Sequence, residues 1–240
     1  MIQDSVLGWR DSLAMRPLMK RMAKGWRELS FESVELADYD WVDRQALGYY
    51  ERAFASLGFR TLDDLSSGQS GNVEGFMRLM GHEAERVTVS LMVTKILLRS
   101  PQPFACALNS PLSQGWVMGA TDGEANPILT QLRLPRAVAL RDCDAAPAEL
   151  WRQTLLVREQ LMQEKSLQPV GEASVSGFVA MSQCLNRERA ELVAQITPVQ
   201  FAVRRRVLMR TPPPRRALWT GEWTPQTPPL DGLVTEGLSV

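Results

Sequence analysis

The sequence predicts an α+β fold: an antiparallel meander of about five strands packed against helices, with C-terminal helices and two terminal arms. Hydrophobic residues make up 45% of the 240 residues and charged residues 22%, as in ordinary globular proteins. Apolar residues recur at the 3.6-residue spacing of a helix before residue 58 and after residue 146. Between these two positions, apolar and polar residues alternate as in a strand. Short breaks separate the alternating segments, which favours hairpins over β-α-β crossovers.

The first predicted element is a basic amphipathic helix over residues 5–29, broken near Pro17. Such a helix docks on its own domain, on a partner protein or on an anionic membrane surface. Residues 31–36 are predicted to form a short strand. Asp40 is the expected N-cap of a second helix that runs to Leu57. Gly58 fits the left-handed position after that helix, with Phe59 folding back onto the last turn.

Five strands are expected between the helical segments. The alternation is cleanest at residues 87–94, where every second residue from Val87 to Val93 would lie on one buried face. A weaker strand is expected over residues 137–140. The predicted strands of the meander span residues 59–65, 73–80, 87–97, 104–109 and 115–121.

Three further helices are expected, over residues 146–163, 174–196 and 198–210. Pro147 falls in the first turn of its helix, where a missing N–H matters least. Thr197-Pro198 is typical of an N-cap followed by proline at the first helical position. The remaining tail holds six prolines and three glycines in 30 residues, a composition that favours an extended or disordered segment.

These elements predict four parts: an N-terminal arm, a core domain, C-terminal helices and a Pro-rich tail anchored by tryptophan. Their bounds are residues 1–30, 31–165, 166–210 and 211–240.

Charge is unevenly distributed along a chain whose net charge is zero. Residues 1–30 carry net +3 and residues 187–216 net +6, whereas residues 31–186 carry net −6 and residues 217–240 net −3. The basic segments could lie against the acidic body of the same chain, against a second copy, or against an acidic partner. The zero net charge gives no indication of a nucleic-acid partner.

Four of the seven tryptophans lie in the first thirty and last thirty residues. Chain ends are usually polar and frayed. Because these two ends carry large apolar side chains instead, both are expected to dock on a protein surface. Tryptophan is enriched in the residues that dominate binding energy at interfaces. The arginine run near the tail could also bind, although a solvated or salt-bridged helix face is the better explanation for it. The predicted binding residues are Trp9, Trp26, Trp219, Trp223, Arg204, Arg205 and Arg206.

Catalytic signatures are absent from the sequence. The one histidine, His82, begins a string like HExxH, but Arg86 stands where the second histidine belongs. No phosphate-binding glycine loop and no nucleophile elbow occur. The carboxylate clusters at residues 38–43, 63–64 and 142–144 suit helix starts and a strand end better than a metal site. Three distant cysteines predict neither a disulfide framework nor a zinc site.

We therefore expect a non-catalytic binding or assembly protein that acts through its terminal arms, without cofactor or metal. One alternative is an enzyme that uses His82 with Glu83 or Glu85. The other is a peripheral membrane protein attached by residues 5–29.

The absence of a secretory signal and of a 20-residue apolar run predicts a cytoplasmic location, with attachment to the inner membrane as the variant. Arginine outnumbers lysine 23 to 4, which favours a bacterial source.

Overall fold

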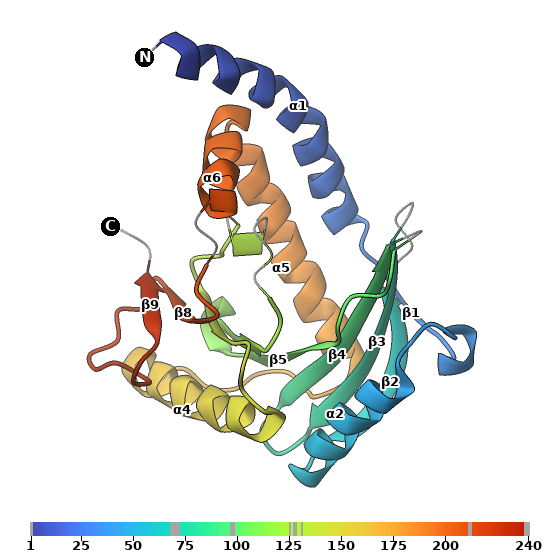
Figure 1. Cartoon of the computed structure of the whole chain (residues 1–240). Coiled ribbons are helices and arrows are strands. Elements are labelled where there is room, and N and C mark those ends of the chain that lie inside the picture. The colour runs from blue at the N-terminus through green and yellow to red at the C-terminus, as the bar shows by residue number, and fades with distance from the viewer. Residues whose placement is uncertain are drawn as a thin grey trace. The chain divides into compact units, whose positions relative to one another are not determined.

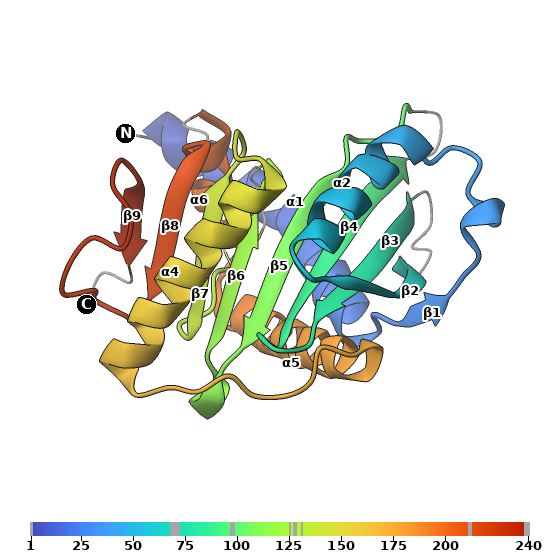
Figure 2. The ribbon, with the colours of Figure 1, turned by 90° about the horizontal axis from the view of Figure 1, so that it is seen from below.

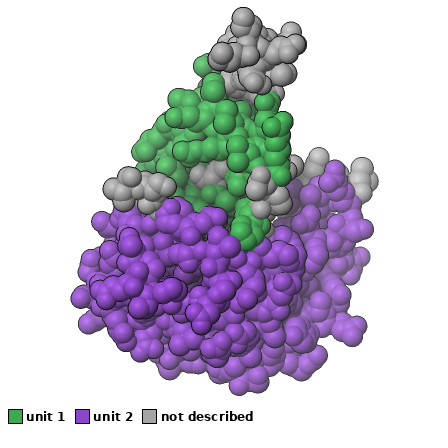
Figure 3. Space-filling model, turned by 60° about the vertical axis from the view of Figure 1, so that its left-hand side comes forward, with its two compact units in different colours: residues 1–29, 125–134, 182–214 green, residues 30–124, 135–181, 215–240 purple. Residues whose placement is uncertain are grey.

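The computed structural model describes residues 2–67, 73–96, 99–124, 126, 129–130, 132–210 and 213–237, without the side chains of residues 2–14, 67 and 209. The chain divides into two compact units, coloured separately in Figure 3. The helical unit comprises residues 1–29, 125–134 and 182–214. The sheet unit comprises residues 30–124, 135–181 and 215–240. The predicted four-part division is not decided by these units and stays a prediction.

One open sheet of nine strands forms the sheet unit, and the strands lie side by side in chain order. Neighbouring strands are antiparallel, except for the parallel pairs β6–β7 and β8–β9. The strands are β1 (Phe31–Ser33), β2 (Arg60–Ser67), β3 (Val73–His82), β4 (Val87–Ile96), β5 (Ala105–Pro111), β6 (Val117–Thr121), β7 (Ala137–Asp142), β8 (Arg216–Gly221) and β9 (Val234–Gly237).

The prediction of a five-stranded antiparallel meander is wrong, because the sheet is larger and mixed. Each of the five predicted segments overlaps a strand, β2 to β6, but the sheet continues through β1 on one side and through β7, β8 and β9 on the other. The composition of the tail does not predict strands, yet β8 and β9 both lie in it. Its prolines lie before β8 and in the connection to β9, so both strands are proline-free and can pair.

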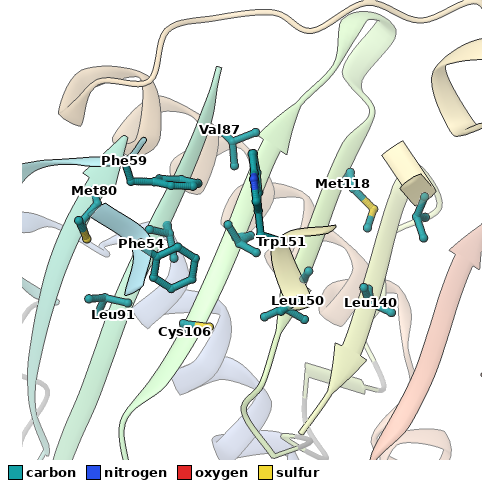
Figure 4. Packing of buried hydrophobic residues seen from close by; sticks show 14 of the residues in the cluster. Phe54, Phe59, Met80, Val87, Leu91, Cys106, Met118, Leu140, Leu150 and Trp151 are labelled. Carbon is teal, nitrogen blue, oxygen red and sulfur yellow. The ribbon is translucent and has the colours of Figure 1, made fainter. Parts of the chain in front are cut away.

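Two helices cover one face of the sheet, α2 (Arg44–Ser56) and α4 (Pro147–Lys165), as Figure 2 shows. Phe54 of α2, Leu150 and Trp151 of α4 and the inward residues of β3 to β7 share one core (Figure 4). On the opposite face, Leu65, Met77 and Leu79 pack with Phe178. The strand β4 is buried on both faces from residue 87 to residue 91, so the prediction of a single buried face there is wrong.

The ends of α2 confirm one prediction and correct another. Asp43, not Asp40, is the N-cap, and its Oδ1 accepts from the backbone N–H of Gln45 at 2.9 Å and of Ala46 at 3.0 Å. Gly58 has φ +95°, as a left-handed residue after a helix requires. The backbone N–H of Phe59 reaches the carbonyl of Phe54 at 3.1 Å, which folds the chain back as predicted.

The described part of the helical unit includes α1 (Ile2–Arg27), the part of α5 (Val175–Gln195) from residue 182 on, and α6 (Pro198–Arg210) (Figure 1). The helix α1 continues through Pro17, contrary to the predicted break, because proline removes one backbone hydrogen bond without necessarily ending the helix. Thr197 caps α6 as predicted, with its Oγ1 accepting from the N–H of Gln200 at 3.2 Å. The core contains Met19, Leu132, Val193 and Phe201.

The predicted strand at residues 31–36 is shorter than expected and ends at Ser33, because a 3₁₀ turn, η1 (Leu36–Asp38), follows it. A second 3₁₀ turn, η2 (Ser113–Gly115), joins β5 to β6. None of the helices in the described part of the chain combines the length and the apolar character needed to cross a bilayer.

Candidate functional site

The C-terminal tryptophans belong to the sheet unit. Trp223 is 1% exposed and lies in the main core, and its Nε1 donates to Oε2 of Glu164 at 2.8 Å. Trp219 lies on β8 and is half-buried. Trp223 is therefore inaccessible to a partner while the sheet unit is folded.

The N-terminal tryptophans lie on α1. Trp26 is half-buried and packs against the core of the helical unit. The side chain of Trp9 lies outside the described part of the structure. Trp26 therefore helps to fix α1 on its own unit, and binding of a partner by these two tryptophans stays a prediction.

The arginine run Arg204–Arg205–Arg206 lies on α6, with all three side chains exposed. Three consecutive residues fan around a helix, so the run does not form one basic face. The guanidinium Nη1 of Arg205 lies 3.9 Å from the sulfur of Met15 on α1, which directs this side chain toward the neighbouring helix.

A groove of about 660 Å³ crosses the helical unit beside α1. Four basic side chains line it, Arg16, Lys20, Lys24 and Arg27, and all four are exposed. Their spacing of four, four and three residues places them on one side of the helix. Among the described residues of the lining, Glu28 is the one acid, and its carboxylate lies 3.8 Å from Nζ of Lys24.

The other residues of the groove are apolar and come from both of its walls. Met19 and Ala23 belong to α1. Val193, Ile196 and their neighbours come from the end of α5 and the start of α6. The sequence showed the basic spacing on α1, but it gave no signal that the end of α5 would supply the opposite wall.

The division into units sharpens the charge pattern of the sequence. The helical unit holds 13 basic and 5 acidic residues, net +8, whereas the sheet unit holds 14 basic and 22 acidic residues, net −8. The groove therefore lies on a strongly basic body, which attracts anionic groups from solution.

His82 is the last residue of β3. Its ring is half-buried, 5.2 Å from the ring of Phe59 and 5.5 Å from that of Trp151. Its Nδ1 accepts from the backbone N–H of Glu85 at 3.2 Å. These contacts describe a packed structural histidine.

The carboxylates beside His82 are both engaged in ion pairs. Glu83 pairs with Arg60 at 3.1 Å, and Glu85 pairs with Arg158, which is 5% exposed. His82 and Glu85 therefore join the β3–β4 hairpin to α4, through Trp151 and Arg158, whereas Glu83 pairs with Arg60 of β2.

The acidic clusters have separate structural partners. Asp64 makes a bidentate pair with Arg78 at 2.7 and 2.8 Å, and Asp142 accepts from Arg216 at 3.0 Å. Within the described ranges, no three His, Cys, Asp or Glu side chains come together as a metal site would require. The expectation of capping holds for Asp43, whereas Asp64 and Asp142 serve ion pairs instead.

No protein-family model matches the chain, and it matches neither a curated protein nor a solved structure.

Proposed function

We propose that the chain is a non-catalytic binding protein that recognises an acidic segment of a partner protein through its helical unit. The observation that carries this proposal is the groove beside α1, where an apolar floor is bordered by Arg16, Lys20, Lys24 and Arg27. A helix with an apolar stripe flanked by carboxylates would complement both features at once.

The concave form of the groove favours a protein over a membrane surface. A bilayer surface is broad and would meet the rim of a groove more readily than its floor, where Met19 and Val193 are buried. A helix is convex and can place single apolar side chains between two helices. Attachment to a membrane surface is the competing explanation, and the test below includes vesicle binding as the outcome that would support it.

The test uses a fluorescent 18-residue peptide that carries leucine on one helical face and glutamate on both flanks. We expect saturable binding in a fluorescence anisotropy titration, weakening as sodium chloride is raised because the contact is partly ionic. The variant Lys20→Glu/Lys24→Glu should weaken binding at least tenfold. A scrambled peptide of equal composition should bind much more weakly, because it lacks the apolar stripe.

The matched control is Arg21→Glu/Arg187→Glu, which makes the same charge change at exposed positions of the helical unit outside the groove. It should keep binding within about threefold, since long-range steering is the only term that it alters. Equal binding of the scrambled peptide, or equal losses in both double variants, would refute the groove as the site. Binding to phosphatidylserine vesicles without binding to the peptide would replace this proposal with the membrane-surface alternative.

A further inference from the structure

A second hollow, of about 710 Å³, lies wholly within the sheet unit. It is bordered by α2, by β4, by the segment that leads into β5, by the segments that follow β6 and β7, and by Pro147 at the start of α4. The strands β6 and β7 are parallel, and ligand sites commonly lie beyond the carboxyl ends of parallel strands. No motif in the sequence pointed to this place.

One wall of the cleft is apolar and aromatic. Tyr49 is 51% exposed and Met92 is 38% exposed, so both side chains offer apolar surface to a ligand in the hollow. Phe104 and Pro103 continue this wall. The ring of Tyr49 meets that of Tyr50 edge-on at 5.3 Å, so its orientation is constrained.

The other wall is anionic. Asp122, Glu124 and Asp144 line it, and Arg215 is the single cation among the lining residues that the structure describes, which gives these residues net −2. Arg215 pairs with Glu124 through Nη1 and with Asp144 through Nη2, the latter at 2.9 Å. Because this guanidinium is already held between two carboxylates, an incoming anion would meet a surplus of negative charge.

The uncharged groups of the cleft suit binding better than nucleophilic chemistry. Burial raises the pKa of the Cys143 thiol, and Glu124 raises it further, so the thiol stays protonated near neutral pH. The hydroxyl of Tyr50 donates to Asp122 at 2.7 Å, and its pKa is also raised, first by burial. Neither residue is poised as a nucleophile.

We propose that this cleft binds an organic ammonium ion that carries an aromatic or apolar group. The apolar group would lie against Tyr49, Met92 and Phe104, and the ammonium would face Glu124 and Asp144. An aromatic face attracts a cation, which adds to the attraction of the carboxylates. The N-terminus of α4 borders the cleft but already holds a carboxylate, Glu149, in its first turn, so it does not reverse this preference for a cation. This inference is independent of the groove in the helical unit.

The test compares three probes of similar shape on the full chain by isothermal titration calorimetry: phenethylammonium, phenethyl alcohol and phenylpropionate. We expect saturable binding of the ammonium, with the alcohol and the carboxylate at least tenfold weaker. The variant Glu124→Gln/Asp144→Asn should remove the preference for the ammonium, since Arg215 then loses both of its ionic partners. Tyr49→Leu should weaken ammonium binding about threefold.

The matched control is Glu32→Gln/Asp38→Asn, which removes two exposed carboxylates outside the cleft. It should leave ammonium binding within about twofold. Tighter binding of phenylpropionate than of phenethylammonium by the unaltered chain would overturn the proposal, as would no binding of any probe at millimolar concentration. An equal response of the cleft variant and the control variant would also overturn it. The probe comparison needs no variant, so it stands even if a substituted chain folds poorly.

Discussion

At the scale of single residues, polar pairs join distant parts of the sheet unit. The carboxylate of Glu164 on α4 accepts from the indole of Trp223, and Arg158 on the same helix pairs with Glu85 in the β3–β4 hairpin. Each pair gives a buried donor, the Trp223 indole or an Arg158 guanidinium nitrogen, a carboxylate acceptor from another segment. Losing one partner of such a pair costs more than the pair itself contributes, because the other partner stays desolvated.

The pair of Tyr50 and Asp122 predicts a distinctive pH dependence. Burial is the largest cause of the raised pKa of Tyr50, and the hydrogen bond to Asp122 adds to it. The unfolded chain has an ordinary tyrosine pKa of about 10. The stabilisation from the neutral hydroxyl is therefore fully present below pH 10 and is lost as pH rises above 10, where only the unfolded chain ionises.

We expect Tyr50→Phe to lower the free energy of unfolding by about 1–2 kcal/mol at pH 7, because Asp122 loses a hydrogen bond. The difference from the unaltered chain should shrink above pH 10, since phenylalanine has no proton to lose. Urea unfolding followed by circular dichroism at pH 7 to 11 measures both. Tyr49→Phe, at an exposed ring, is the control and should change stability by less than about 0.5 kcal/mol. A constant Tyr50→Phe difference across this range would contradict the raised pKa.

At the scale of elements, the helix ends were the most predictable features. The residues after α2 and before α6 were assigned correctly from Gly58 and from Thr197-Pro198, because those residue types fit special backbone positions. The N-cap of α2 was placed three residues early, since both Asp40 and Asp43 are chemically suitable. Local chemistry alone could not choose between two aspartates.

Two glycines associated with α2 predict opposite effects of the same substitution. Gly58 has φ +95°, and an added Cβ would lie 3.0 Å from Nε2 of His82. Gly48 lies inside the helix, where the nearest atom to an added Cβ is the guanidinium of Arg52, at the end of a flexible side chain. We expect Gly58→Ala to destabilise the chain by about 1–2 kcal/mol. Gly48→Ala should stabilise it by about 0.5–1 kcal/mol.

Chemical denaturation of both variants beside the unaltered chain checks the two signs. The two substitutions are matched, since each adds one methyl group to a glycine of the same segment. Destabilisation by Gly48→Ala would show that Arg52 cannot move aside. A neutral effect of Gly58→Ala would show that the turn tolerates another backbone conformation.

Strand locations were predictable, but their partners were not. The alternation of apolar and polar residues predicted β2 to β6. The order of these strands was also predictable, because each one pairs with the next along the chain. The neighbours of β7 come from far along the chain: β7 pairs with β6 across a connection of 15 residues and with β8 across 73 residues. Short strands such as β9 carry little periodicity, so only long-range pairing defines them.

At the scale of the whole molecule, the candidate sites depend on segments that the sequence keeps apart. The basic spacing of α1 was visible, but the apolar wall from the end of α5 was not. The cleft of the sheet unit draws Tyr49, Phe104, Asp122 and Asp144 from four separate segments. Charge, by contrast, was already partitioned in the sequence, and the two units gather it into net +8 and net −8.

Each unit has its own buried cluster, and this predicts that damage to one core stays local. Phe201 is fully buried in the helical unit with Met19, Leu132 and Val193. We expect Phe201→Ala to cost about 3–5 kcal/mol of local stability. Backbone hydrogen exchange, followed by mass spectrometry, should speed up in α1, α6 and residues 182–195 and stay unchanged in β3 to β5.

The reciprocal variant makes this prediction decisive. Phe54 is fully buried in the core of the sheet unit, and Phe54→Ala removes the same side chain there. It should speed exchange in α2, α4 and the strands that they cover, while α1 and α6 keep their rates. Faster exchange throughout the chain in both variants would instead mean that the two units unfold as one cooperative structure. The basic helical unit could then not open or rearrange on binding an acidic partner without the sheet unit unfolding with it.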